Sequence, residues 1–126
     1  MRTIAEGAAI LHSEGVTRRD LKPPNIIMMS GEGFEVGGEA FLTDFWSARV
    51  VEMMGHARAS ADAGTLQYTP PGVLRDEPQD YTRVDVYALS VMSWDVLSGR
   101  VPFGAAPEAA VREMVKNGDR PEIPDG

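Results

Sequence analysis

The sequence contains no cysteine and only two histidines, His12 and His56, among its 126 residues. Disulfide bonds and thiolate metal sites are therefore excluded, and a zinc centre would lack imidazole ligands. Lysine is equally scarce and occurs only as Lys22 and Lys116. No apolar run approaches the roughly 18 residues of a membrane span, and the charged N-terminus does not fit a signal peptide. We therefore expect a cytoplasmic protein.

The charges that are present give a formal net charge of −7, with 43% apolar and 25% charged residues. This composition is typical of a globular chain, and the length allows one domain or a part of one. An acidic surface repels phosphate backbones and anionic lipids. We therefore expect neither nucleic acid nor membrane as the main partner.

Several segments show regular periodicity. Thr3 and Glu6 have the spacing of a capping box, and a helix with an apolar face should follow and end before Gly15. Short apolar runs at 26–29 and 40–43 predict two strands joined by a glycine-rich loop, which together form a hairpin. Residues 46–66 are small, polar and aperiodic, which predicts a long connection.

The second half of the chain predicts two more helices. Residues 84–97 are apolar on nearly every face, which predicts a buried central helix that stops before Gly99. A further helix should run from Pro107 to Lys116, with Gly118 as its cap and three inward residues, Val111, Met114 and Val115. The predicted fold is mainly α with one small hairpin, an α+β arrangement.

The candidate chemistry lies in two turns. Asp20, Lys22 and Asn25 follow one another in VTRRDLKPPN, and Asp44 ends the next strand in LTDF. Alone, the first three also fit an ordinary polar turn between a helix and a strand. Phosphoryl transfer requires a carboxylate that orients the attacking hydroxyl, a nearby cation and hard oxygen ligands for magnesium. The four residues supply these groups if the hairpin brings the two turns together.

Motifs along the whole chain occur in a familiar order: IAEGAAILHSEGV, RRDLKPPNI, LTDF, GTLQYTPPGVL, YTRVDVYALSVMSWDVLSGRVPF and NGDRPEIP. In this order they resemble the C-terminal lobe of a eukaryotic-type protein kinase. DLKPPN is similar to serine/threonine kinases, and the stretch from residue 85 to 103 is similar to the tyrosine-kinase-like branch. The resemblance implies a partial kinase domain over residues 1–126, with helices around one buried central helix and the hairpin at the catalytic loop.

The resemblance also implies roles at the candidate site. Asp20 would be the catalytic base or hydroxyl-orienting carboxylate, and Lys22 would stabilise the transferred phosphate. Asn25 and Asp44 would bind Mg²⁺, with ATP as the phosphate donor. The partner would be a protein substrate or another bound protein.

Four further residues receive regulatory or structural roles from the resemblance. Arg19 would pair with a phosphorylated residue, for which Ser60 is the candidate, and Thr65 would lie beside the catalytic loop. Asp85 would accept hydrogen bonds from the catalytic-loop backbone, because a carboxylate in so apolar a helix is costly unless it is bonded. Alternatively, Asp85 is an exposed carboxylate near a helix N-terminus, where the dipole favours it.

The sequence departs from the kinase pattern at three positions. Arg18 replaces a histidine, and a permanent cation cannot substitute for a neutral ring in an apolar stack. Trp46 replaces a glycine after Asp44-Phe45, and Gly72 replaces the glutamate that closes the activation segment. The 126 residues also contain no strand lysine for the nucleotide, and the glycine-rich run at 31–38 follows the catalytic loop instead of preceding it.

Two functional hypotheses follow from these observations. In the first, the chain is a fragment of a serine/threonine kinase, a family that transfers the ATP γ-phosphate to protein hydroxyls, and it does not catalyse this transfer by itself. In the second, it is a pseudokinase module that binds proteins without catalysis. A helical interaction domain unrelated to kinases would require all the ordered matches to be accidental.

Overall fold

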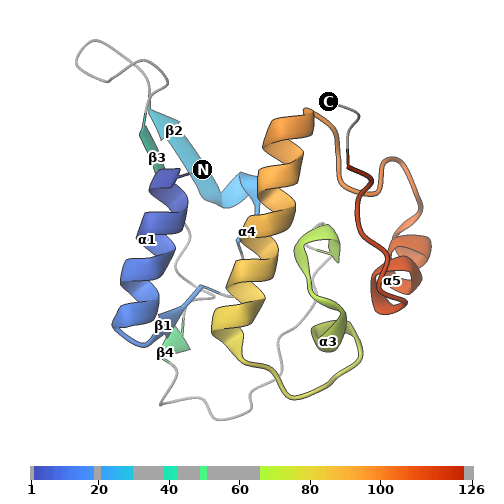
Figure 1. Cartoon of the computed structure of the whole chain (residues 1–126), viewed down its shortest axis with the longest axis horizontal. Coiled ribbons are helices and arrows are strands. Elements are labelled where there is room, and N and C mark those ends of the chain that lie inside the picture. The colour runs from blue at the N-terminus through green and yellow to red at the C-terminus, as the bar shows by residue number, and fades with distance from the viewer. Residues whose placement is uncertain (1, 19–20, 30–38, 43–48, 51–65, 124–126) are drawn as a thin grey trace.

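The computed structural model describes residues 2–18, 21–29, 39–42, 49–50 and 66–123. The predicted loop between the hairpin strands and nearly all of the connection 46–66 lie outside these ranges. The described part is mostly helical with few strands, in agreement with the predicted fold class (Figure 1).

The chain begins with helix α1 (Arg2–Ser13), close to the predicted bounds. Ile4 and Ala8 are buried, four residues apart on one face of this helix. Gly15 ends the helix with a left-handed φ of 73°, and its N–H donates to the carbonyl of His12 at 3.0 Å. The turn directs the chain into strand β1 (Val16–Thr17).

Within the described ranges, four short strands form two antiparallel pairs. Strand β1 pairs with β4 (Arg49–Val50), with Val16 opposite Val50. A single 3-10 turn, η1 (Pro23–Asn25), leads into β2 (Ile26–Met29). Strand β2 pairs with β3 (Glu39–Leu42), with Ile26 opposite Leu42. The predicted hairpin is therefore confirmed, and its strands begin directly after the candidate loop.

Helix α4 (Tyr81–Ser98) lies between α1 and the C-terminal elements (Figure 1). The Asp80 side chain caps its N-terminus by accepting from the N–H of Thr82 at 3.0 Å. Gly99 ends it with a left-handed φ of 64°. The inward face of α4 consists of Val84, Asp85, Ala88, Val91 and Met92. None of the helices that the structure describes is both long and apolar enough to cross a membrane.

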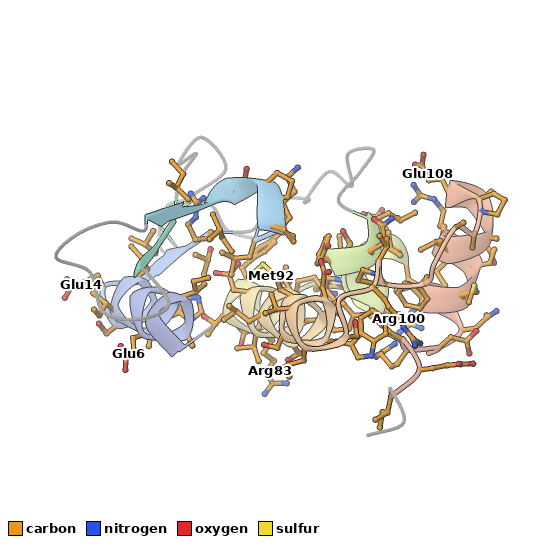
Figure 2. All side chains as sticks on the ribbon, turned by 90° about the horizontal axis from the view of Figure 1, so that it is seen from above. Glu6, Glu14, Arg83, Met92, Arg100 and Glu108 are labelled. Atoms are coloured by element: carbon orange, nitrogen blue, oxygen red, sulfur yellow. The ribbon has the colours of Figure 1, made fainter. Side chains whose placement is uncertain are left out.

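The prediction that α4 is buried on all sides is wrong. Val86, Val96 and Leu97 are 51%, 61% and 85% exposed. Figure 2 shows Met92 and Arg83 on opposite sides of α4, with Arg83 and Glu6 of α1 both pointing away from the hairpin. The exposed apolar side chains Val86, Val96 and Leu97 therefore face solvent.

The C-terminal part packs around a second set of elements: η3 (Leu66–Tyr68), α3 (Pro71–Leu74) and α5 (Glu108–Lys116). Their contacts bury an apolar cluster, against which Phe103 and Ala106 also pack; its members are Leu66, Leu74, Val111 and Val115. Pro107 precedes the first turn of α5 instead of occupying it, a shift of one residue from the prediction. The inward residues Val111 and Val115 are buried as predicted.

The segment after α5 packs along α4. The Trp94 indole donates from Nε1 to the carbonyl of Glu122 at 2.7 Å. The Arg120 guanidinium lies over the Tyr87 ring, 5.1 Å from its centroid. These two contacts cover the Tyr87 and Trp94 side of α4 and leave Val86 and Leu97 uncovered.

The exposed Val86 and Leu97 side chains of α4 predict self-association, because exposed apolar surface favours contacts between molecules. We expect Leu97→Lys to reduce the concentration-dependent association of the chain in sedimentation velocity experiments. Asn117→Lys is the matched control, because it adds the same charge at an exposed position directly after α5, outside α4, and removes no apolar surface. Equal association of the two variants would show that the apolar side chain is not responsible.

The Tyr87 hydroxyl predicts a second measurable effect. It is buried without a hydrogen-bond partner in the described structure, and this burial raises its pKa, with the Arg120 charge acting in the opposite direction. Tyr87→Phe removes the unsatisfied hydroxyl and keeps the ring under Arg120. We expect unchanged stability or a gain of up to about 1 kcal/mol in urea denaturation. Tyr87→Leu, which also removes the ring, should be less stable; a clear loss in Tyr87→Phe would contradict this account.

Candidate functional site

The candidate catalytic loop leaves β1 at Arg18 and enters β2 after Asn25. Lys22 is extended, with φ −155°, and Pro23 and Pro24 start the η1 turn behind it. The N–H of Asn25 closes this turn by donating to the carbonyl of Lys22 at 2.9 Å. The structure thus places two of the predicted site residues in one turn, with Asn25 buried and Lys22 half-buried.

The start of the loop is held by Asp85 of α4. Asp85 is 0% exposed and lies in the second turn of the helix, so the alternative of an exposed N-terminal carboxylate does not hold. Its Oδ2 accepts from the backbone N–H of Arg18 at 2.8 Å. The same oxygen lies 2.8 Å from Nε2 of His12 in the last turn of α1. One carboxylate therefore joins three parts of the fold.

Arg18 is itself fully buried, at 0% exposed. The bond to Asp85 uses its main-chain N–H, so the replacement of a histidine by arginine leaves this contact possible. The donor in this anchor is the main-chain N–H of residue 18, and the buried side chain takes no part in this bond.

The Gln79 side chain lies against Gly72, the residue predicted to replace a glutamate. A Cβ at residue 72 would clash with the side-chain amide of Gln79. That amide donates to the carbonyls of Glu77 and Pro78 at 2.9 and 3.0 Å. The Gln79 side chain thus occupies the space into which a side chain at residue 72 would extend.

Arg75 connects the end of α3 to α5. Its Nε lies 2.8 Å from Glu77 Oε1, and its Nη1 donates to the carbonyl of Lys116 at 2.8 Å. A cation at the C-terminus of a helix also interacts favourably with the helix dipole. The α3 segment is therefore fixed by groups within this chain.

Tyr68 links η3 to α4. Its hydroxyl donates to Asp95 Oδ2 at 2.9 Å. Burial raises the pKa of Tyr68 strongly, and the hydrogen bond and negative charge of Asp95 raise it further. The neutral hydroxyl is therefore the favoured state in the folded protein.

Several predicted residues lie outside the described ranges: Arg19, Asp20, Asp44, Trp46, Ser60 and Thr65. Their roles remain predictions. Sequence reasoning also missed four residues that the structure brings into contacts: His12, Tyr68, Arg75 and Gln79. His12 is separated from Asp85 by 73 positions, so no local spacing could reveal their contact.

Comparison with known sequences agrees with this arrangement. Residues 1–122 match the sequence family "Protein kinase domain". The chain belongs to the protein kinase family. It is 34% identical over 122 residues to a probable serine/threonine-protein kinase, gdt4, of Dictyostelium discoideum, covering 95% of this chain and 7% of that protein.

Two further relatives come from other kingdoms of life. The serine/threonine-protein kinase PkaB of Streptomyces coelicolor is 35% identical over 127 residues, covering 97% of this chain and 30% of its own length. The serine/threonine-protein kinase STY46 of Arabidopsis thaliana is 32% identical over 122 residues, with 96% and 20% covered. The chain thus spans less than a third of the length of these relatives.

The Tyr68–Asp95 contact predicts a pH-dependent stability. Because the pKa of Tyr68 is higher in the folded state, its contribution is fully present below about pH 10, the ordinary tyrosine value, and is lost as the pH rises further. We expect Tyr68→Phe to lower the free energy of unfolding by about 1–3 kcal/mol at neutral pH. In this variant the free energy of unfolding should also decrease less as the pH rises above about 10. The measurement is urea denaturation across the alkaline range.

Asp95→Asn provides the control for this prediction. It keeps an acceptor of the same shape but removes the charge, so the alkaline loss should be intermediate between that of the parent and that of Tyr68→Phe. Identical alkaline profiles for all three proteins would contradict the role of Tyr68.

Proposed function

We propose that this chain carries the catalytic-loop part of a serine/threonine protein kinase and corresponds to the C-terminal lobe of such a domain. The observation that supports this most is the fixation of the loop at both ends. Asp85 binds the main chain of Arg18 at 2.8 Å, and Asn25 is buried in the turn that enters β2. Phosphoryl transfer depends mainly on such positioning.

Within this proposal, Asp20 orients the attacking hydroxyl of a protein substrate, and Lys22 stabilises the charge on the transferred group. Arg19 pairs with a phosphorylated Ser60, and Thr65 contacts the loop. Because Asp20 lies between Arg18 and Lys22 in the sequence, the Asp85 anchor limits where its backbone can lie.

Membership of the kinase family implies Mg²⁺ and ATP as cofactors. The amide oxygen of Asn25 is a hard ligand of the kind Mg²⁺ prefers, so the described donor fits this ion, and Asp44 would supply the second ligand. When bound, Mg²⁺ and ATP supply the phosphate and neutralise charge on its oxygens. The chain's own contribution is to hold Asn25 and Lys22 in one turn.

A polypeptide of these 126 residues alone is proposed to be inactive. Its two lysines are Lys22 in the candidate loop and Lys116 in α5, so neither lies on a strand that could anchor a nucleotide. A nucleotide is buried in a cleft only when the protein surrounds it from both sides. Without that cleft the phosphate donor is not positioned against the loop, and most of the rate acceleration is lost.

The second candidate function is a pseudokinase module that binds a protein partner without catalysis. Gly72 favours it, because the closing glutamate is absent and Gln79 occupies its space. The exposed apolar side of α4 is also compatible with a protein-binding role. The two functions differ in whether Asp20 affects phosphate transfer.

We expect no magnesium-dependent transfer of phosphate from ATP by the isolated chain. In a chimera, residues 1–122 replace the matching segment of PkaB, and the rest of PkaB supplies the other side of the nucleotide cleft. If the loop is competent, the chimera phosphorylates a serine-containing peptide, and Asp20→Asn lowers the rate about a hundredfold or more.

The chimera separates the two functions. A folded chimera that binds ATP but transfers no phosphate favours the pseudokinase module. Transfer by the isolated chain that disappears in Asp20→Asn would overturn the proposal that this polypeptide is inactive alone. The control is Ser90→Ala, a change at an exposed position of α4 away from the loop.

A further inference from the structure

Gly72 lies inside a helix although its backbone conformation does not require glycine. It is the second residue of α3, and its φ does not fall in the left-handed region. Glycine is less favourable in a helix than any residue except proline. The reason for a glycine at this position should therefore be sought in the space around it.

The side chain of Gln79 fills that space. A Cβ at residue 72 would lie 3.0 Å from the Gln79 Cδ atom and would clash with the amide that this carbon carries. Contacts between non-bonded carbon atoms are most favourable at about 3.5–4.0 Å. Any side chain at residue 72 would therefore have to push the Gln79 amide away.

The Gln79 amide is held in place by two hydrogen bonds. Its Nε2 donates to the carbonyls of Glu77 and Pro78 at 2.9 and 3.0 Å. A side-chain amide nitrogen carries two hydrogens, so both bonds can form at once. Both carbonyls belong to the segment that runs from α3 to the start of α4 (Figure 1). A displaced Gln79 amide would lose both bonds and release this segment.

Glu77, one of the two residues that Gln79 binds, also contacts α3 and the arginine that reaches α5. Its main-chain N–H donates to the carbonyl of Gly72 at 2.9 Å. Its Oε1 lies 2.8 Å from Nε of Arg75, whose Nη1 donates to the carbonyl of Lys116 in α5. The position of Glu77 therefore depends on Gln79 on one side and on α3 on the other.

We propose that Gly72 and Gln79 are a matched pair. The glycine leaves room for the Gln79 amide, and the amide holds the segment between α3 and α4 by its bonds to Glu77 and Pro78. Residue 72 can accept a side chain, including the glutamate of the kinase pattern, only when Gln79 is shortened. This pair goes beyond the proposed function, because it concerns how the chain fixes α3 without that glutamate.

A bland alternative is that Gln79 only rests against Gly72 and turns into solvent at no cost when a side chain appears there. Gln79 is half-buried, and both of its hydrogen bonds are exposed, so the alternative needs a direct test. If it holds, Gly72→Ala changes the stability by the same amount whatever residue stands at position 79. If the two residues are a matched pair, the effect of Gly72→Ala depends on residue 79.

The first test compares four forms of the full 126-residue chain by urea denaturation: the parent, Gly72→Ala, Gln79→Ala and the double variant. In the parent, we expect Gly72→Ala to raise the unfolding equilibrium constant about threefold, because the displaced amide loses two hydrogen bonds. In the Gln79→Ala background, the same change should lower the constant about threefold, because alanine favours a helix more than glycine does. A difference of less than about threefold between the two effects would overturn the proposal.

The second test asks whether the amide itself holds the segment. Gln79→Met keeps a side chain of similar length and removes both donors. We expect hydrogen exchange of the Glu77 amide, measured by NMR, to become about fivefold faster relative to the Ala88 amide of α4. Ala9→Met, which adds the same side chain at an exposed position of α1, is the control and should leave Glu77 exchange unchanged.

Unchanged Glu77 exchange in Gln79→Met would also overturn the proposal, and this test remains available if Gly72→Ala does not fold. Both measurements report on the pair whether or not the candidate loop transfers phosphate. Their failure is therefore distinct from a failure of the proposed kinase function, which the PkaB chimera tests.

Discussion

The arrangement of the N-terminal half depends on one buried carboxylate. Asp85 has no access to water, and its position is set by α4, so the groups that satisfy it must come to it. Among the described residues, those groups include the end of α1, through His12, and the start of the candidate loop, through Arg18. The cost of leaving this charge unsatisfied thus determines where two other elements can lie.

The opposite side of α4 is organised by different forces. There, α3, α5 and η3 enclose an apolar cluster, and single hydrogen bonds fix their ends. Arg75 joins α3 to the carbonyl end of α5, and Tyr68 joins η3 to Asp95. Hydrophobic burial supplies most of the attraction on this side, and the polar contacts select one orientation.

Much of this fold follows from local patterns, and the rest does not. The helices α1, α4 and α5 and the hairpin follow from periodicity, glycines and prolines, which act within a few residues. The environment of Asp85 was predictable, because a carboxylate in an apolar helix needs donors. Its partner His12 was not, since no pattern connects positions 73 apart. The exposure of Leu97 was also missed, because composition reports apolar character but not which neighbours cover it.

The departures from the kinase pattern differ in their physical consequences because of the type of atom involved. At residue 18 the anchoring donor belongs to the backbone, so an arginine there can make the contact with Asp85 that the kinase pattern predicts with a histidine. At residue 72 the lost group is a side chain, which no backbone atom can replace, and the space is taken by Gln79. A contact made by the main chain can therefore persist when the side chain changes, as at residue 18, whereas at residue 72 the Gln79 side chain fills the space and its amide donates to the carbonyls of Glu77 and Pro78.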